Sequence, residues 1–295
     1  MKPEELKRYR DLIDNIDDKL IELLVERAGF VKQVGEKKKK ANLPVFRPER
    51  EVAIIERMCK KNKDLAGFLA DNSIATIWLE IISGCRALER KIEISYLGPP
   101  GTYSELAART LFGHQVLLHP YDSLEEVVRV AEIGKTDLAL IPVENSTEGT
   151  VGKSLDLLLK TSLPISAELS IPIHHLLLRK IDGLDSVKKI VAHGQSLSQC
   201  QKWLDENLPN IPRVSFESNG IAAKEASQDS SLVAIAGYLA AKKYDLKTVA
   251  SRIENDSSNR TRFAALGNFN PDSCGSNQTS LILSVPDKAG AMLSL

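Results

Sequence analysis

The hydrophobic pattern of this chain changes its period near Ile92, and that change constrains the fold more than any other feature. Before Ile92, apolar residues recur every three or four positions, as on one face of an α-helix. After it, short apolar runs alternate with helical patterns, which is typical of α/β units with parallel strands. The 295 residues suffice for two domains at roughly 150 residues each. We therefore expect a helical domain at 1–91 and an α/β domain at 92–270, each with its own apolar set.

Three helices are expected in the first part. The longest spans about Lys7 to Lys40, and the others span about Glu49 to Lys61 and Ala66 to Arg90. The longest would measure roughly 50 Å, which is too long to bury its apolar stripe within so small a domain. We therefore expect a homodimer through these helices, in which a partner chain covers the stripe.

The composition excludes several classes of partner. Lysine plus arginine and aspartate plus glutamate number 39 each, so no overall charge favours nucleic acid or an anionic membrane surface. The N-terminus has no apolar signal segment, and the longest apolar runs are too short to span a bilayer. The 4 cysteines show no paired spacing, so we expect free thiols in a cytoplasmic protein and no metal site.

Charged residues stand out on the predicted helices. Arg27 and Lys38 lie eleven residues apart and share a helix face to within roughly 20°. Arg10 lies on another face, roughly 25 Å before Arg27 along the axis, so it could only act in the site of a partner chain. Any one of these charges alone is more simply a surface residue, but several cations with one acid would suit a small dianion.

As a set, these residues resemble the all-helical chorismate mutase domain over about residues 5–91. The motifs are R-x6-D from Arg10, ER-x7-G-x2-K from Glu26 to Lys38, RE at Arg50, and IISGCRALE on the third helix. The resemblance implies an intertwined dimer that rearranges chorismate to prephenate, with Lys38 and Glu89 at the ether oxygen. Some members have Gln at position 89 and Ser at position 85, and related helical folds cleave isochorismate instead. The implied substrate contacts are Arg10 of the partner, Arg27, Lys38, Arg50, Glu51, Cys85 and Glu89.

Three loops of the second part carry most of its conformationally special polar residues: 98–104, 144–150 and 259–263. Ligands of open α/β sheets bind beyond the carboxyl ends of the strands, so we expect these loops to form one site. The first loop leads into a helix N-terminus, which suits an anion. It lacks GxGxxG and GK[ST], so it is neither a dinucleotide fingerprint nor a P-loop.

These loops resemble prephenate dehydratase over about residues 93–266, through YLGPPGTYSELAA, IPVENSTEGTVG, IHHLLL, AHGQSLSQC and NRTRF. The resemblance implies two α/β lobes of the periplasmic-binding-protein type around a cleft. Lobe 1 would comprise about 92–169 plus 248–270, and lobe 2 about 170–247. The implied reaction dehydrates and decarboxylates prephenate to phenylpyruvate without a metal or an organic cofactor.

The same resemblance makes Thr261 the central catalytic residue, with its hydroxyl beside the leaving hydroxyl of prephenate. Arg262 is the implied partner of a substrate carboxylate. Relatives often carry Ser where this chain has Ala192. The other implied polar contacts are Thr102, Ser104, Glu144, Asn145, Ser146 and Gln199.

After a predicted linker at 271–278, residues 279–295 resemble the first strand of an ACT regulatory domain. We expect a truncated start of such a domain, because the segment stops inside its first helix. One alternative to the enzyme remains open: a noncatalytic two-lobed sensor of an aromatic acid with a helical dimerisation arm.

Overall fold

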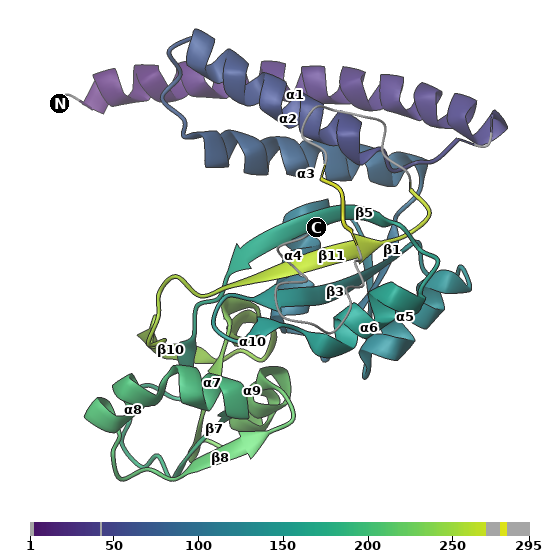
Figure 1. The fold of residues 1–295 in the computed structure, drawn as a ribbon. Coiled ribbons are helices and arrows are strands. Elements are labelled where there is room, and N and C mark those ends of the chain that lie inside the picture. The colour runs from purple at the N-terminus through teal and green to yellow at the C-terminus, as the bar shows by residue number, and fades with distance from the viewer. Residues whose placement is uncertain (1–2, 42, 270–277, 282–295) are drawn as a thin grey trace, which may run out of the picture.

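The computed structural model describes residues 3–41, 43–269 and 278–281. A layer of helices lies across one end of an α/β part that contains two separate sheets (Figure 1). The expected linker and ACT-like segment fall outside the described residues except at 278–281. No helix in the described ranges is both long and apolar enough to cross a membrane.

The helical layer consists of α1 (Pro3–Lys40), α2 (Pro48–Asp64) and α3 (Asp71–Glu89), as predicted. Pro48 begins α2, where a missing backbone N–H costs nothing. The apolar stripe of α1 is not covered within one chain. Its large side chains remain 50–60% exposed at Leu12, Ile16, Leu20, Leu23 and Phe30.

The sheet of lobe 1 has the strand order β2-β1-β3-β11-β5, with β4 added to β3. Strands β1, β2 and β3 are parallel, whereas β11 runs antiparallel to both of its neighbours. Its strands are β1 (Glu93–Leu97), β2 (Leu117–Tyr121), β3 (Leu138–Asn145), β4 (Gly149–Thr150), β5 (Ile165–Pro172) and β11 (Arg260–Leu266). Its helices are α4 (Tyr103–Phe112), α5 (Leu124–Glu132) and α6 (Gly152–Lys160).

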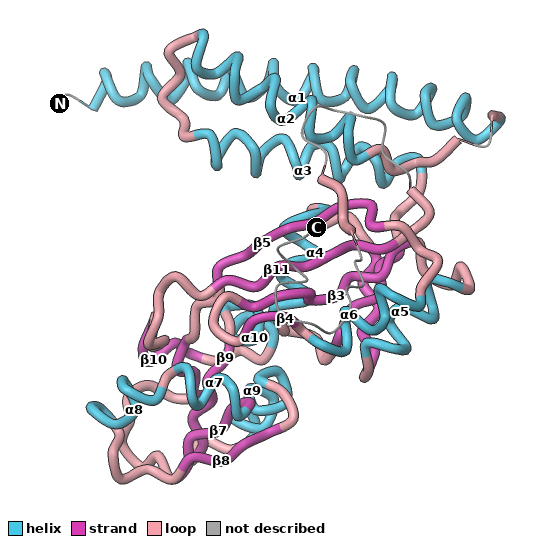
Figure 2. The backbone as a smooth tube through the Cα atoms, in the orientation of Figure 1, coloured by secondary structure: helices cyan, strands magenta, loops and turns pink. Residues whose placement is uncertain are grey.

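The sheet of lobe 2 has the order β10-β6-β9-β7-β8. β7 pairs parallel with β8 and β9, whereas β6 pairs antiparallel with β9 and β10. Its strands are β6 (Leu176–Arg179), β7 (Lys189–His193), β8 (Arg213–Phe216), β9 (Leu232–Ala236) and β10 (Lys247–Ser251). Its helices are α7 (Gly194–Gln199), α8 (Gln201–Asn207), α9 (Asn219–Gln228) and α10 (Tyr238–Lys243). Figure 2 shows the strands as two groups joined by the two crossings of the chain.

The chain crosses between the lobes slightly later than the sequence predicts. Ser170 still belongs to β5, and Thr248 still belongs to β10, so the crossings are residues 173–175 and 252–259. The sequence predicts parallel strands, but not every strand of the two sheets is parallel. β5 and β10 pair antiparallel with strands far away in sequence. Local periodicity carries no information about such partners.

The two parts do not keep separate apolar sets. Phe46, in the loop between α1 and α2, is only 3% exposed and belongs to the core of lobe 1. Its ring makes edge contacts with Phe112 and Phe269, both at 5.4 Å between centroids. Arg90 also reaches across the junction to Asp137 with two hydrogen bonds of 2.7 Å. The helical layer is therefore anchored to lobe 1 by packing as well as by charge.

Candidate active sites

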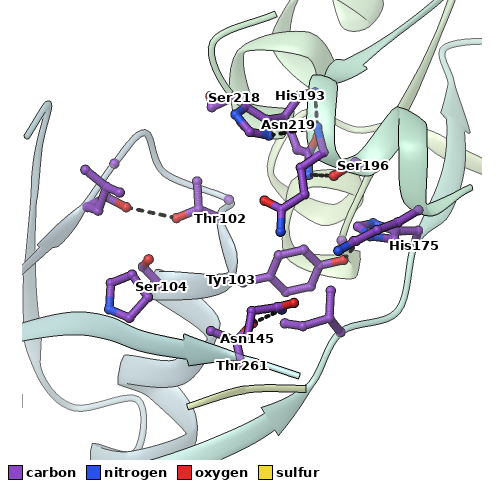
Figure 3. Close-up of a pocket in the computed structure, with 18 of the residues that line it drawn as sticks. Thr102, Tyr103, Ser104, Asn145, His175, His193, Ser196, Ser218, Asn219 and Thr261 are labelled. Atoms are coloured by element: carbon purple, nitrogen blue, oxygen red, sulfur yellow. Dashed lines mark hydrogen bonds between the residues drawn. The ribbon is translucent and has the colours of Figure 1, made fainter. Parts of the chain in front are cut away.

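A cleft of about 260 Å³ lies between the lobes, and Figure 3 shows side chains from both lobes converging on it. Its polar walls come from short segments at strand ends and helix starts. Lobe 1 contributes Thr102, Tyr103, Ser104, Asn145 and Thr261, while lobe 2 contributes His193, Gln195, Ser196, Gln199, Ser218 and Asn219.

The sheet topology explains why these segments meet. The loop after β1 and the end of β3 lie at the carboxyl edge of the parallel strands. Because β11 is antiparallel, its first residues lie at that same edge, and Thr261 stands directly opposite Asn145. Three loops distant in sequence thereby form one wall, as the sequence predicts.

The Thr261 hydroxyl is held by an asparagine that is itself fixed. Asn145 Nδ2 donates to Thr261 Oγ1 at 2.9 Å and to Asn259 Oδ1 at 3.0 Å. Asn145 Oδ1 accepts from the backbone N–H of Thr147 at 3.0 Å. Since the Thr261 oxygen accepts this bond, its hydroxyl hydrogen remains available for a group bound in the cleft.

Gln199 connects the lobes across the cleft. Its Nε2 donates to Thr147 Oγ1 at 3.0 Å, and its Oε1 lies 3.0 Å from His175 Nε2 and accepts from Asn259 at 3.2 Å. Burial lowers the pKa of His175, so the imidazole is neutral and carries its hydrogen on Nε2, facing the carbonyl of Gln199. Tyr103 closes this side by donating to the His174 carbonyl at 2.6 Å.

Several helices begin at the cleft. The residues that cap the N-termini of α4, α7, α9 and α10 all line it: Thr102, His193, Ser218 and Gly237. Backbone N–H groups at such ends attract anions. None of the described residues that line the cleft is a lysine or an arginine. The cleft therefore offers helix N-termini and hydroxyl groups, together with the acid Glu217.

Three residues expected at this site do not line the cleft. Arg262 and Glu144 pair with each other at 3.0 Å, and Arg262 also reaches Glu168 at 3.4 Å. Side chains alternate along β11, so Thr261 and Phe263 face the cleft and Arg262 faces away. The Ser146 hydroxyl instead accepts from the backbone N–H of Arg260 at 2.9 Å.

A second polar cluster lies where the three helices approach lobe 1. Lys38 Nζ is 3.2 Å from Glu89 Oε2 and donates to the Val45 carbonyl at 3.2 Å. Gly35 leaves the room that Glu89 occupies, since a Cβ at Gly35 would lie 2.7 Å from Glu89 Cγ. Cys85 is buried on the same helix as Glu89, one turn earlier.

A single chain does not bring all of the other expected cations to this cluster. Arg27 Nη1 is shielded from solvent and has no hydrogen-bond partner within the described part of the chain. Arg50 is exposed at the start of α2. Arg10 is exposed and lies roughly 40 Å from Lys38 along α1 at 1.5 Å per residue. A single chain therefore does not bring Arg10 to Lys38.

One residue of this cluster was missed from the sequence. Arg86 is 4% exposed and donates to both carboxylate oxygens of Glu51 at 2.6 and 2.7 Å. It lies within the motif IISGCRALE, but an arginine on a helix is ordinarily a surface residue. His175 was likewise contained in IHHLLL without a predicted role. Among the described residues, no three His, Cys, Asp or Glu side chains gather as metal ligands.

Two family models match the chain: chorismate mutase type II over residues 9–90 and prephenate dehydratase over residues 94–270. The bifunctional chorismate mutase/prephenate dehydratase of Neisseria gonorrhoeae is 42% identical over 295 residues, covering 99% of this chain and 80% of that protein. The protein of the same name from Pseudomonas aeruginosa is 39% identical over 298 residues, covering 99% and 81%.

Among solved structures, the prephenate dehydratase of Arthrobacter aurescens in complex with L-Phe is similar with a TM-score of 0.58 and 28% identity. The match covers 68% of this chain and 70% of that one. These similarities favour the enzyme over the noncatalytic sensor. The chain therefore belongs to the bifunctional chorismate mutase/prephenate dehydratases, which rearrange chorismate to prephenate and convert prephenate to phenylpyruvate.

Proposed function

We propose that the dehydratase reaction takes place in the cleft between the lobes, with Thr261 as its proton donor. The observation that carries this assignment is the direction of the hydrogen bond between Asn145 and Thr261. The Thr261 hydroxyl can donate to the leaving hydroxyl of prephenate, and the Asn145 amide stabilises the charge that then grows on the threonine oxygen.

The electron flow follows from aromatisation. The bond between the ring and its carboxylate breaks, carbon dioxide leaves, and the electron pair enters the ring. The C4–O bond then breaks, and the departing oxygen takes the proton from Thr261 to leave as water. None of the described residues that line the cleft is a lysine or an arginine that could stabilise the negative charge of the ring carboxylate. That carboxylate therefore leaves more readily as carbon dioxide. Thr102, Ser104 and the helix starts are suited to the second carboxylate, which persists in the product.

For the mutase reaction we propose the cluster around Lys38. The rearrangement needs the substrate held in a reactive conformer and positive charge at the ether oxygen. Lys38 supplies that charge, and Glu89, whose Oε2 is 3.2 Å from Lys38 Nζ, lies beside the same oxygen. Arg50 and Arg27, whose shielded Nη1 has no partner among the described residues, are suited to the carboxylates. Glu51 accepts from the substrate hydroxyl, and Cys85 lines the same region.

A reciprocal pair of variants tests this division of roles. Thr261→Val keeps the shape of the side chain but removes the hydroxyl, so dehydratase kcat should fall by about two decades or more. Lys38→Met should abolish most mutase turnover. Each variant should retain the other activity of the same chain, measured with prephenate and chorismate separately. Near-normal prephenate turnover in Thr261→Val would refute the role of the threonine.

We also propose a homodimer in which α1 packs against α1 of a partner and brings the partner's Arg10 to the mutase site. The exposed apolar stripe of α1 supports it, since lone chains rarely expose so much contiguous apolar surface. Ile16→Asp together with Leu20→Asp should give a monomer in sedimentation and reduce mutase activity. A monomeric wild-type protein with full mutase activity would contradict the dimer.

We place the enzyme in the cytoplasm. The free thiols of Cys59, Cys85 and Cys200 support a reducing compartment. Cell fractionation with both activities as markers tests the assignment, and activity confined to an extracytoplasmic fraction would contradict it.

A further inference from the structure

Arg86 on α3 joins the two enzymes of this chain at one guanidinium group. Nη1 donates to both oxygens of Glu51 on α2, at 2.6 and 2.7 Å. Nη2 donates to the backbone carbonyl of Phe112, the last residue of α4 in lobe 1, at 2.5 Å. The guanidinium carbon also lies 5.5 Å from the centre of the Phe46 ring. The group therefore contacts the mutase cluster on one side and the dehydratase lobe on the other.

Burying the Arg86 guanidinium costs free energy unless all of its hydrogen-bond partners are present. Arg86 is almost fully buried, and a buried guanidinium needs an anion and filled donor positions. The Phe112 carbonyl lies at the C-terminal, negative end of α4, which favours a cation there. Phe46 packs over the group and is itself held in the lobe 1 core by Phe112. The position of Arg86 is thus fixed from the dehydratase side.

We propose that Arg86 is a positioning residue for the mutase reaction, which holds the Glu51 carboxylate in place from an anchor in the dehydratase lobe. The inference rests on the role proposed above for Glu51 as acceptor of the substrate hydroxyl. Arg86 touches no substrate in this scheme. It fixes the direction of the Glu51 oxygens and balances their charge, so the mutase site is completed by the neighbouring lobe.

The charges around Glu51 define how the effect would be measured. Arg86 on α3 and Lys38 on α1 favour its ionised form, whereas Glu49 on its own helix opposes it. Burial is the largest influence and raises the pKa of Glu51, and Arg86 is the main group that offsets it. Without Arg86 the pKa of Glu51 rises further, so the carboxylate is lost at a higher pH. The acid limb of the mutase rate should then move towards neutral pH.

The experiment uses the whole two-domain chain and measures mutase kcat and KM across pH with chorismate. Arg86→Met should lower mutase kcat by on the order of tenfold to a hundredfold, the scale of a misplaced catalytic group, and should shift the acid limb upwards. Arg90→Met is the matched control. Arg90 spans the same junction but pairs with Asp137 and not with Glu51, so its variant should keep mutase kcat within about twofold.

Dehydratase activity in the same chain reports whether the Arg86→Met protein is folded. If it is not, Arg86→Lys provides the test, because a lysine keeps the charge but cannot bond Glu51 and Phe112 at once. That variant should show a smaller loss of kcat with the same direction of pH shift. A folded Arg86 variant with an unchanged mutase rate and pH profile would overturn the inference, as would an equal loss in Arg90→Met.

Glu51→Gln separates this inference from the function on which it rests. Normal mutase activity in Glu51→Gln would remove the proposed role of Glu51 itself. If mutase activity is impaired in Glu51→Gln but normal in Arg86→Met, only the proposed role of Arg86 is removed. If both are impaired, the double variant should lose no more than the worse single one, because both changes act on one carboxylate. Additive losses would show that Arg86 acts by another route.

Discussion

Asn145 and Thr261 stand opposite each other on antiparallel strands, and the asparagine amide donates to the threonine hydroxyl at 2.9 Å. The direction of this bond leaves the hydroxyl hydrogen of Thr261 available to a group bound in the cleft. The bond joins strands β3 and β11, which are more than a hundred residues apart in sequence. The proposed dehydratase site therefore depends on a contact that only the sheet provides.

Reversing that bond should stop the dehydratase. Asn145→Asp places an oxygen where the amide was, so the Thr261 hydroxyl donates to the aspartate instead of the substrate. We expect dehydratase kcat to fall by about two decades. Mutase activity of the same protein should stay at the wild-type rate and serves as the control. A functional Asn145→Asp enzyme would show that Thr261 does not need the amide.

Gly35 should be required for the mutase because of the space it leaves. An alanine there would put its Cβ 2.7 Å from Glu89 Cγ and push that side chain away from Lys38. We expect Gly35→Ala to lower mutase kcat by on the order of tenfold or more. Gly29→Ala on the same helix is the control, since a Cβ added at Gly29 would meet nothing within 4 Å among the described residues. Equal effects of the two alanines would point to helix propensity rather than to Glu89.

His175 should make the stability of the protein depend on pH. Burial lowers its pKa below the ordinary value of 6.5, so the unfolded chain binds a proton where the folded chain does not. Stability should therefore decrease as pH falls below about 6.5 and level off once the folded imidazole is protonated. His175→Gln removes this contribution. Urea unfolding at several pH values should show a shallower dependence in the variant, and an unchanged slope would exclude His175.

Much of the site could be predicted because its residues lie in local motifs. The change of period near Ile92 separates the helical layer from the α/β part. Polar residues at strand ends indicated the wall that holds Thr102, Asn145 and Thr261. Strand ends collect at one edge of a sheet whatever the details of its pairing, so this inference did not require the register.

The tertiary structure decided what depends on side-chain direction and on distant partners. Arg262 is adjacent to Thr261 in sequence, yet alternation along β11 turns it towards Glu144 and away from the cleft. Arg86 and Phe46 look like a surface and a loop residue, but packing between the domains buries both. Sequence by itself determined which residue types are present and their local periodicity. Which of them meet was decided by long-range contacts, because a buried charge is stable only where distant groups supply its partners.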